Sequence, residues 1–351
     1  MNNLWDIAVE KSHRNEDAGT TSAENALFLV GGKNAGKTSI ILRFLDRSEA
    51  PKPTVALEYT YARRAKGHNM AKDIGHLWEL GGGTWLSKLM DIPLNPDNLQ
   101  QTALMLVLDL SNPGEMWFTL ETLLATARAR IETIISEMRQ THPNIRETLT
   151  KRAWERLGED VQDKGIIDPF PIPLFIIGSK YDLFQEFESE KRKVICKTLR
   201  FVAHTNGASL HSFSTKIDQL VNRAKLLMTN HLFSTLPSKT LQTEYSKPLM
   251  IPAGLDDLAS IGNVPLSDKD IGRVNARKPI ELWKHCFTSF FPQTATDNPA
   301  KVDDPAKDSK YAEPTIDTLR AQKDEELERY RRLSERRAQK KAQGRYDEVQ
   351  A

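Results

Sequence analysis

The sequence predicts an α/β fold with a mainly parallel central sheet flanked by helices, then a C-terminal extension and a charged helical tail. Three observations support this prediction. Strand-like and helix-like hydrophobic patterns alternate through residues 25–236, which is typical of parallel strands joined by crossover helices. A glycine-rich loop joins the first strand to the first helix at residues 31–38. Beyond residue 236 the alternation stops, and beyond residue 313 charged residues dominate.

The first strand and helix flank a phosphate-binding motif. The apolar run 26–30 predicts a buried strand, and residues 39–45 have helical periodicity. The loop between them fits G-x-x-x-x-G-K-[ST], the P-loop, whose backbone N–H groups face a polyphosphate at a helix N-terminus. Lys37 is expected between the outer phosphates, and the Thr38 hydroxyl on Mg²⁺. The residues expected to bind nucleotide here are Gly31, Gly32, Asn34, Ala35, Gly36, Lys37, Thr38 and Ser39.

The remaining elements follow in order. Further strands are predicted at residues 55–61, 74–80, 103–109, 173–178 and 208–214. One helix follows Pro113, another covers about residues 187–204, and a third carries an apolar stripe between Ile217 and Met228. Residues 140–170 are predicted as an insertion with a short helix around Trp154 and then a loop.

The chain divides into five predicted parts. Residues 1–24 form an N-terminal arm with a short amphipathic piece around Leu4, Trp5 and Ile7, expected to pack on a domain or a partner. The other parts are the α/β domain (25–236), a loop-rich extension packed on it (237–292), a polar linker (293–312) and a tail (313–351).

The tail is predicted as a long charged helix. Its first half is acidic, its second half is basic, and its apolar stripe is thin: Ile316, Leu319, Leu327, Tyr330 and Leu333. Such a helix buries little surface by itself. Two interpretations stay open, a solvated or partly disordered tail and a helix that docks on a partner.

Composition excludes several classes of function. Of 351 residues, 39% are hydrophobic and 27% charged, and the net charge is only +2, so whole-protein attraction to nucleic acid is not expected. Two cysteines indicate reduced thiols rather than a disulfide scaffold. No run is long enough for a membrane helix, and we expect no myristoyl or prenyl anchor.

Two segments after the P-loop resemble the parts of a guanine-nucleotide switch that bind Mg²⁺ and the γ-phosphate. Thr54 lies where a switch threonine would close over the metal; an ordinary turn before a strand is the alternative. The D-x-x-G element is replaced by Glu79-Leu80-Gly81-Gly82, in which Glu79 can reach the metal shell and Gly82 the γ-phosphate. Gly83 stands where a glutamine would orient water, so fast hydrolysis is not expected. Asp109, at the end of an apolar strand, is a weaker rival for the metal.

Two further segments resemble the base-binding elements. Ser179-Lys180-Tyr181-Asp182 resembles N-K-x-D, with Asp182 accepting hydrogen bonds from guanine and the Lys180 stem covering the base. Ser179 stands where that motif has an asparagine, so one contact between the loop and the base is shorter or lost. Ser214-Thr215-Lys216 resembles the S-A-K loop, so Thr215 and Lys216 are expected beside the base. The ordered set is a much stronger indication of a guanine-nucleotide P-loop fold than any one of its members.

Longer runs of the sequence resemble the dynein light intermediate chain family. They are residues 32–38, 51–61, 78–83 and 174–182, and residues 184–193 and 200–204 narrow the resemblance to the cytoplasmic dynein 2 branch. That resemblance implies a Ras-like P-loop domain that binds and stabilises the dynein 2 heavy chain tail. It also implies contact with other dynein 2 subunits and with intraflagellar transport trains. The implied location is the cytoplasm, the cytoskeleton and the cilium, including its base and axoneme.

Three interpretations of the nucleotide site remain. The first is a non-catalytic scaffold that holds GTP or GDP with Mg²⁺, with Thr38, Thr54 and Glu79 as the metal residues and no catalytic residue. The second is an active GTPase switch that controls motor assembly. The third is an empty pocket kept as architecture. The residues Glu79, Gly83 and Ser179 favour the first over the second, and the intact P-loop favours both over the third.

Overall fold

The computed structural model describes residues 24–65, 73–159, 161, 163–236, 240–265, 277–294 and 313–349. The predicted arm, apart from Glu24, and residues 295–312 of the predicted linker lie outside these ranges. The chain forms two compact units, residues 1–297 and 298–351.

A seven-stranded sheet forms the centre of the first unit, in the order β2-β3-β1-β4-β5-β6-β7. Strands β3, β1, β4, β5 and β6 are parallel to one another, while β2 is antiparallel to β3 and β7 is antiparallel to β6. The mainly parallel α/β fold is therefore confirmed. The strands are β1 (Ala26–Gly31), β2 (Leu57–Arg64), β3 (Asp73–Leu80), β4 (Thr102–Asp109), β5 (Leu174–Ser179), β6 (Ser209–Ser212) and β7 (Met250–Ile251).

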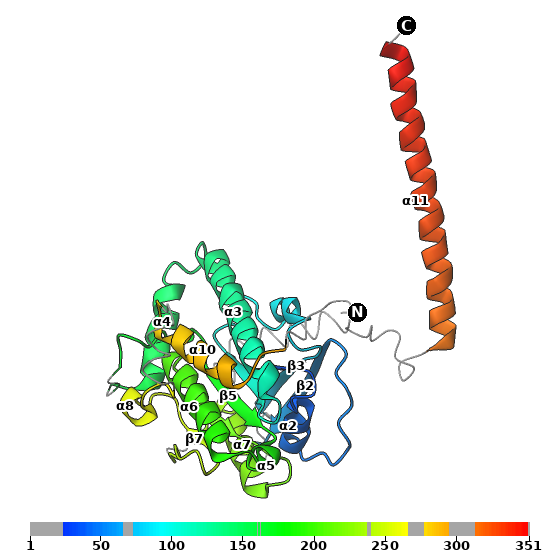
Figure 1. Cartoon of the computed structure of the whole chain (residues 1–351). Coiled ribbons are helices and arrows are strands. Elements are labelled where there is room, and N and C mark those ends of the chain that lie inside the picture. The colour runs from blue at the N-terminus through cyan, green and yellow to red at the C-terminus, as the bar shows by residue number, and fades with distance from the viewer. Residues whose placement is uncertain are drawn as a thin grey trace, which may run out of the picture. The chain divides into compact units, whose positions relative to one another are not determined.

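Helices cover both faces of the sheet (Figure 1). The longer ones are α2 (Lys37–Phe44), α3 (Pro113–Met138), α4 (Ile145–Leu157), α6 (Ser189–Thr205), α7 (Asp218–Leu232) and α10 (Pro279–Phe290). The short ones are η1 (Ser87–Asp91), α5 (Tyr181–Phe184) and α8 (Leu258–Ile261). Neighbouring side chains of a strand point to opposite faces, so Phe28 packs in the core under α3 and α6, while Leu27 and Leu29 pack under α2 and α7.

The strand boundaries differ from the predicted ones where tertiary contacts decide them. Predicted strand 55–61 begins two residues later, at Leu57, because the segment before it runs beside the glycine loop at Gly81. Predicted strand 208–214 ends at Ser212, although the Phe213 backbone N–H still donates to Gly178 O on β5 at 2.7 Å. The predicted insertion contains α4, a full amphipathic helix with Leu149 and Ala153 buried.

The extension joins the α/β unit through the sheet and through two helices. β7 pairs with β6, although no strand was predicted after residue 214. Helix α10 packs across α6 and α3 (Figure 1), with the Phe201 and Trp283 rings stacked at 4.9 Å. Gln293, the first residue of the predicted linker, contacts α3, because its side chain accepts a hydrogen bond from Trp117 N at 3.0 Å.

The second unit contains one long helix, α11 (Pro314–Val349). Its described side chains, through residue 336, are all exposed, including the thin apolar stripe. Within the described ranges, no helix has the length and apolar character of a membrane span.

Candidate nucleotide site

The P-loop connects β1 to α2 at a point where only glycine fits. Gly31 has φ +153°, and a Cβ atom there would lie 2.1 Å from the Val107 carbonyl oxygen on β4. Gly36 has φ +92° at the start of α2, and Asn34 has φ +60° in the loop. These backbone conformations suit glycine and asparagine and strain other residues. The loop is thus wrapped closely over the ends of β1 and β4.

Lys37 is folded back onto the loop that it belongs to. Its Nζ donates to the carbonyl oxygens of Gly31 at 3.0 Å and Gly32 at 2.8 Å, and the side chain is buried. Burial lowers its pKa to about 8, against the opposing attraction of Glu79. A buried ammonium stabilised mainly by carbonyl dipoles favours an anion beside it.

The predicted metal residues meet at one place. The Thr38 hydroxyl donates to Glu79 Oε1 at 2.7 Å and lies 3.5 Å from the Thr54 hydroxyl. Glu79 comes close because β3 is the parallel neighbour of β1, with Glu79 in register with Leu29. Because the Thr38 hydroxyl hydrogen points to Glu79, the lone pairs of the oxygen are left for a cation. In this arrangement Glu79 orients the hydroxyl, which is the usual role of an outer partner in a metal site.

A second carboxylate, Glu58, stands beside this group and was not predicted. It accepts a hydrogen bond from Thr54 at 3.1 Å and lies opposite Glu79 in the β2–β3 register. Burial raises the pKa of Glu79, and the negative charge of Glu58 adds to that rise, while the Thr38 hydrogen bond and Lys37 oppose it. The antiparallel pairing of β2 with β3 sets this position, and the alternating sequence pattern alone does not specify that pairing.

The glycine loop after β3 approaches the P-loop and the Thr54 segment. A Cβ on Gly81 would lie 2.4 Å from the Thr54 carbonyl oxygen, and Gly81 N donates to Ala56 O at 2.6 Å. Gly82 and Gly83 have φ near +69° and +64°. A Cβ on Gly83 would lie 3.3 Å from the Lys33 nitrogen. Gly83 therefore places backbone, not a water-orienting side chain, against the P-loop.

The predicted base-binding residues also converge. One Asp182 oxygen accepts a hydrogen bond from Ser214 at 2.7 Å, and the other pairs with Lys216 Nζ at 2.8 Å. Burial would raise the pKa of Asp182, but these two partners lower it overall. The carboxylate is thus ionised and oriented, as an acceptor for the N–H edge of guanine must be. Lys216 is largely exposed, and Thr215 lies in the turn between Ser214 and Lys216.

Two other residues at this end have structural partners. The Ser179 hydroxyl is buried and donates to Leu108 O at 3.0 Å, so it faces the sheet. Lys180 Nζ pairs with Asp109 Oδ2 at 2.5 Å, while Asp109 Oδ1 accepts from the Ser111 hydroxyl. Asp109, the alternative carboxylate for the metal, therefore pairs with Lys180. Glu79 is the carboxylate that contacts Thr38.

The donor set fits a guanine nucleotide with Mg²⁺. Backbone N–H groups and Lys37 would hold phosphates, Thr38 and Thr54 offer hydroxyl oxygens to the cation, and Asp182 would accept from the base. Glu79, buried and bonded to Thr38, would hold that hydroxyl toward the cation and add negative charge beside it. Among the described residues no group of three or more His, Cys, Asp or Glu side chains forms a separate metal cluster.

Comparison with known proteins identifies the family. The dynein light intermediate chain (DLIC) family model matches residues 1–172. Cytoplasmic dynein 2 light intermediate chain 1 of Bos taurus is 49% identical over 336 residues, covering 94% of this chain and 95% of that protein. The proteins of the same name from Homo sapiens and Danio rerio are 48% and 46% identical, each with 94% of this chain covered and 95% and 94% of their own lengths.

The chain belongs to the dynein light intermediate chain family. Within that family its sequence is of the cytoplasmic dynein 2 type. A solved structure of the conserved domain of the dynein light intermediate chain is similar in fold, with a TM-score of 0.53 and 16% identity, over 76% of this chain and 89% of that one. The family prediction made from the sequence is therefore confirmed.

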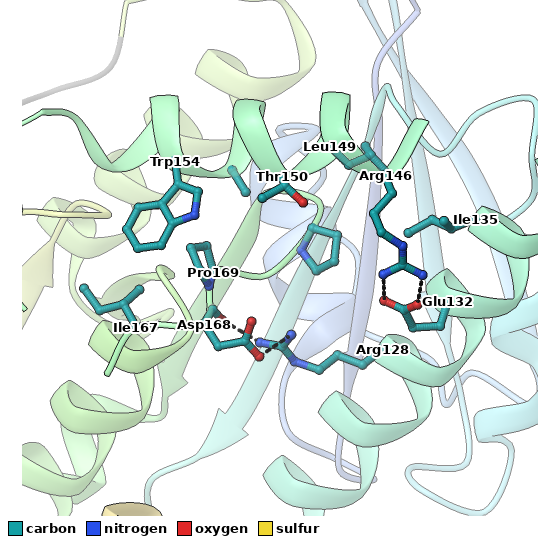
Figure 2. A pocket seen from close by; sticks show the side chains of 12 residues that line it. Arg128, Glu132, Ile135, Arg146, Leu149, Thr150, Trp154, Ile167, Asp168 and Pro169 are labelled. Atoms are coloured by element: carbon teal, nitrogen blue, oxygen red, sulfur yellow. Dashed lines mark hydrogen bonds and ion pairs between the residues drawn. The ribbon is translucent and has the colours of Figure 1, made fainter. Parts of the chain in front are cut away.

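A pocket of this light intermediate chain lies apart from the nucleotide residues (Figure 2). It has a volume of about 240 Å³ and lies between α3, α4 and the loop before β5. Its two arginines are already paired: Arg128 with Asp168 at 3.0 Å and Arg146 with Glu132 at 2.5 Å. Figure 2 shows both pairs beside the apolar side chains of Trp154, Leu149 and Ile135. Carboxylates therefore neutralise both arginines of the pocket, whereas the Lys37 ammonium of the P-loop contacts carbonyl oxygens.

Proposed function

We propose that this chain is a non-catalytic subunit of the cytoplasmic dynein 2 motor that binds and stabilises the heavy chain tail. The proposal rests on the similarity to dynein 2 light intermediate chains across 94% of the chain. Its wider partners are the other dynein 2 subunits and intraflagellar transport trains. Its work is retrograde intraflagellar transport and cilium assembly, at the cilium, including its base and axoneme, and in the cytoplasm and cytoskeleton.

In this proposal the nucleotide site has a structural role. The observation that carries it is the assembled group of Lys37, Thr38 and Glu79, beside a loop in which Gly83 offers no side chain to water. The buried Lys37 would neutralise negative charge on the phosphates of GTP or GDP. The Thr38 and Thr54 hydroxyls would ligate Mg²⁺. Because a ligand that binds only the folded state stabilises it by mass action, retention without turnover is sufficient. The binding surfaces for the heavy chain then stay ordered.

The test measures nucleotide content and heavy-chain binding on the same sample. The chain is co-expressed with the dynein 2 heavy chain tail, purified, denatured, and the released nucleotide is analysed by chromatography. We expect guanine nucleotide at close to one per chain and very slow turnover. Lys37→Ala should release the nucleotide while leaving much of the heavy-chain binding, and Lys33→Ala, at an exposed loop position, should change neither.

Two results would contradict the proposal in different ways. A preparation without nucleotide, still bound to the heavy chain, would leave the motor role and remove the structural role of nucleotide. Complete loss of heavy-chain binding by a folded Lys37→Ala chain would instead make nucleotide a control on assembly. The 3.5 Å approach of Thr54 to Thr38 is the feature that would favour this second function, an active switch, and fast hydrolysis would support it.

A further inference from the structure

An exposed aromatic surface lies on the outer strands of the sheet. Tyr59 and Tyr61 on β2 pair in register with Trp78 and His76 on β3, so all four side chains share one face. The ring centroids of Tyr59 and Trp78 are 4.8 Å apart, and those of Tyr59 and His76 are 5.9 Å apart. The two tyrosines are 45% and 43% exposed. We name these four residues the aromatic face.

The aromatic face lies on the two outermost strands at one end of the described sheet. β2 is the end strand and pairs only with β3 there. Trp78 packs partly against the core under α3, whereas Tyr59 and Tyr61 stay outside that core. Exposed aromatic surface on an edge strand promotes unwanted strand pairing, and native proteins usually cover such edges with other parts of the chain.

The N-terminal arm enters the domain at the border of this face. Glu24, the first described residue, contacts His76 Nε2 at 2.9 Å, and His76 Nδ1 lies 2.8 Å from the Tyr59 hydroxyl. The arm therefore begins beside the surface that needs covering. An extended chain spans about 3.3 Å per residue, so the segment between Val9 and Glu24 can reach any point within roughly 50 Å.

The composition of the arm matches the surface. Residues 4–10 read Leu4-Trp5-Asp6-Ile7-Ala8-Val9-Glu10, apolar residues with two carboxylates between them. Next to the aromatic face, Arg63 stacks over the Tyr61 ring at 4.8 Å and donates to its hydroxyl at 3.1 Å. Among the residues that the structure describes, no carboxylate pairs with Arg63. Apolar side chains opposite tyrosines, with an acidic group near an arginine, form a complementary surface.

We propose that residues 4–10 of this chain pack on the aromatic face of the same molecule and cover that side of its two outer strands. Leu4, Trp5 and Ile7 contact the rings of Tyr59, Tyr61 and Trp78. Asp6 and Glu10 supply the negative charge next to Arg63. The arm thereby also covers β2, the strand that follows Thr54.

Chemical crosslinking in the full chain tests this arrangement. The native thiols Cys196 and Cys286 are buried, so introduced cysteines react with little background. Ala8→Cys is combined with Tyr61→Cys, and the control combines Ala8→Cys with Leu226→Cys, an exposed position on α7 that is 47% exposed. With a short bismaleimide we expect intramolecular coupling about tenfold faster or more for the first pair, because docking raises the effective concentration.

A second variant distinguishes docking from simple proximity in the chain. Adding Trp5→Asp and Ile7→Asp to the first pair should lower its coupling rate to that of the control, because the apolar anchors are lost. Hydrogen exchange of the β2 amides should then accelerate, while the amides of β1 remain protected. Equal coupling for both pairs, or coupling unaffected by the Asp substitutions, would overturn the proposal. Coupling only between molecules would assign the aromatic face to a second copy and would overturn it as well.

Discussion

The Thr38 hydroxyl donates a 2.7 Å hydrogen bond to Glu79, which joins the start of α2 to the end of β3. This contact fixes the orientation of the one P-loop oxygen that would bind a cation. It also shows that a glutamate at the position of the aspartate of D-x-x-G reaches the Thr38 hydroxyl. The glutamate reaches the hydroxyl itself, so its longer side chain is accommodated as an orienting partner.

Neutralising this carboxylate should weaken nucleotide retention through the metal. Glu79→Gln keeps an acceptor for Thr38 but removes the charge, and loss of such a partner typically costs about 10–100-fold in metal affinity. The Mg²⁺-dependent slowing of fluorescent-nucleotide release should shrink accordingly. Glu155→Gln is the matched control, because Glu155 on α4 is exposed and approaches Lys151 only to 3.9 Å. An unchanged Mg²⁺ effect in Glu79→Gln would show that the metal sits elsewhere.

Nucleotide affinity should fall as the pH rises through about 8, the pKa to which burial lowers the Lys37 ammonium from its ordinary value of 10.5. Phosphates require the charged ammonium, which is lost above that pH. Between the folded and unfolded pKa values the unfolded chain binds the extra proton, so the nucleotide-free protein should become more stable with rising pH. Binding titrations and urea unfolding across this range measure both effects. Lys37→Arg keeps its positive charge over this pH range. If its nucleotide affinity fell with pH in the same way, deprotonation of Lys37 would not be the cause.

Replacing Gly83 with glutamine should not produce a fast GTPase. At Gly83 the backbone has φ +64° and a new Cβ would start 3.3 Å from the Lys33 nitrogen. We expect Gly83→Gln to lose roughly 1–2 kcal/mol of stability from its left-handed backbone and to hydrolyse GTP no faster than the parent. Gly165→Gln, at a site with nothing within 4 Å, controls for the substitution itself. A large gain in single-turnover rate would mean that only the missing side chain limits hydrolysis.

The extension should depend on one buried ion pair. Arg200 on α6 donates to both Asp256 oxygens at 2.9 and 2.6 Å, and both side chains are buried. Asp256→Ala leaves a buried guanidinium uncompensated, for which a loss of about 3–5 kcal/mol is expected in chemical unfolding. Glu132→Ala, which breaks the exposed pair with Arg146, should cost about 0–1 kcal/mol. Similar losses in the two variants would refute the special role of the buried pair.

The sequence by itself determined the parts of this protein whose residues are adjacent in the chain. The P-loop, the alternation of strands and helices and the family followed from contiguous patterns, because local spacing sets local conformation. The approach of Glu79 to the P-loop could also be expected from sequence, since its strand ends in a recognisable glycine run. Glu58 beside Thr54, Lys180 on Asp109 and Arg200 on Asp256 were decided only by the tertiary structure. Their partners come from different strands or helices, and only strand register and helix packing bring such side chains within hydrogen-bonding distance.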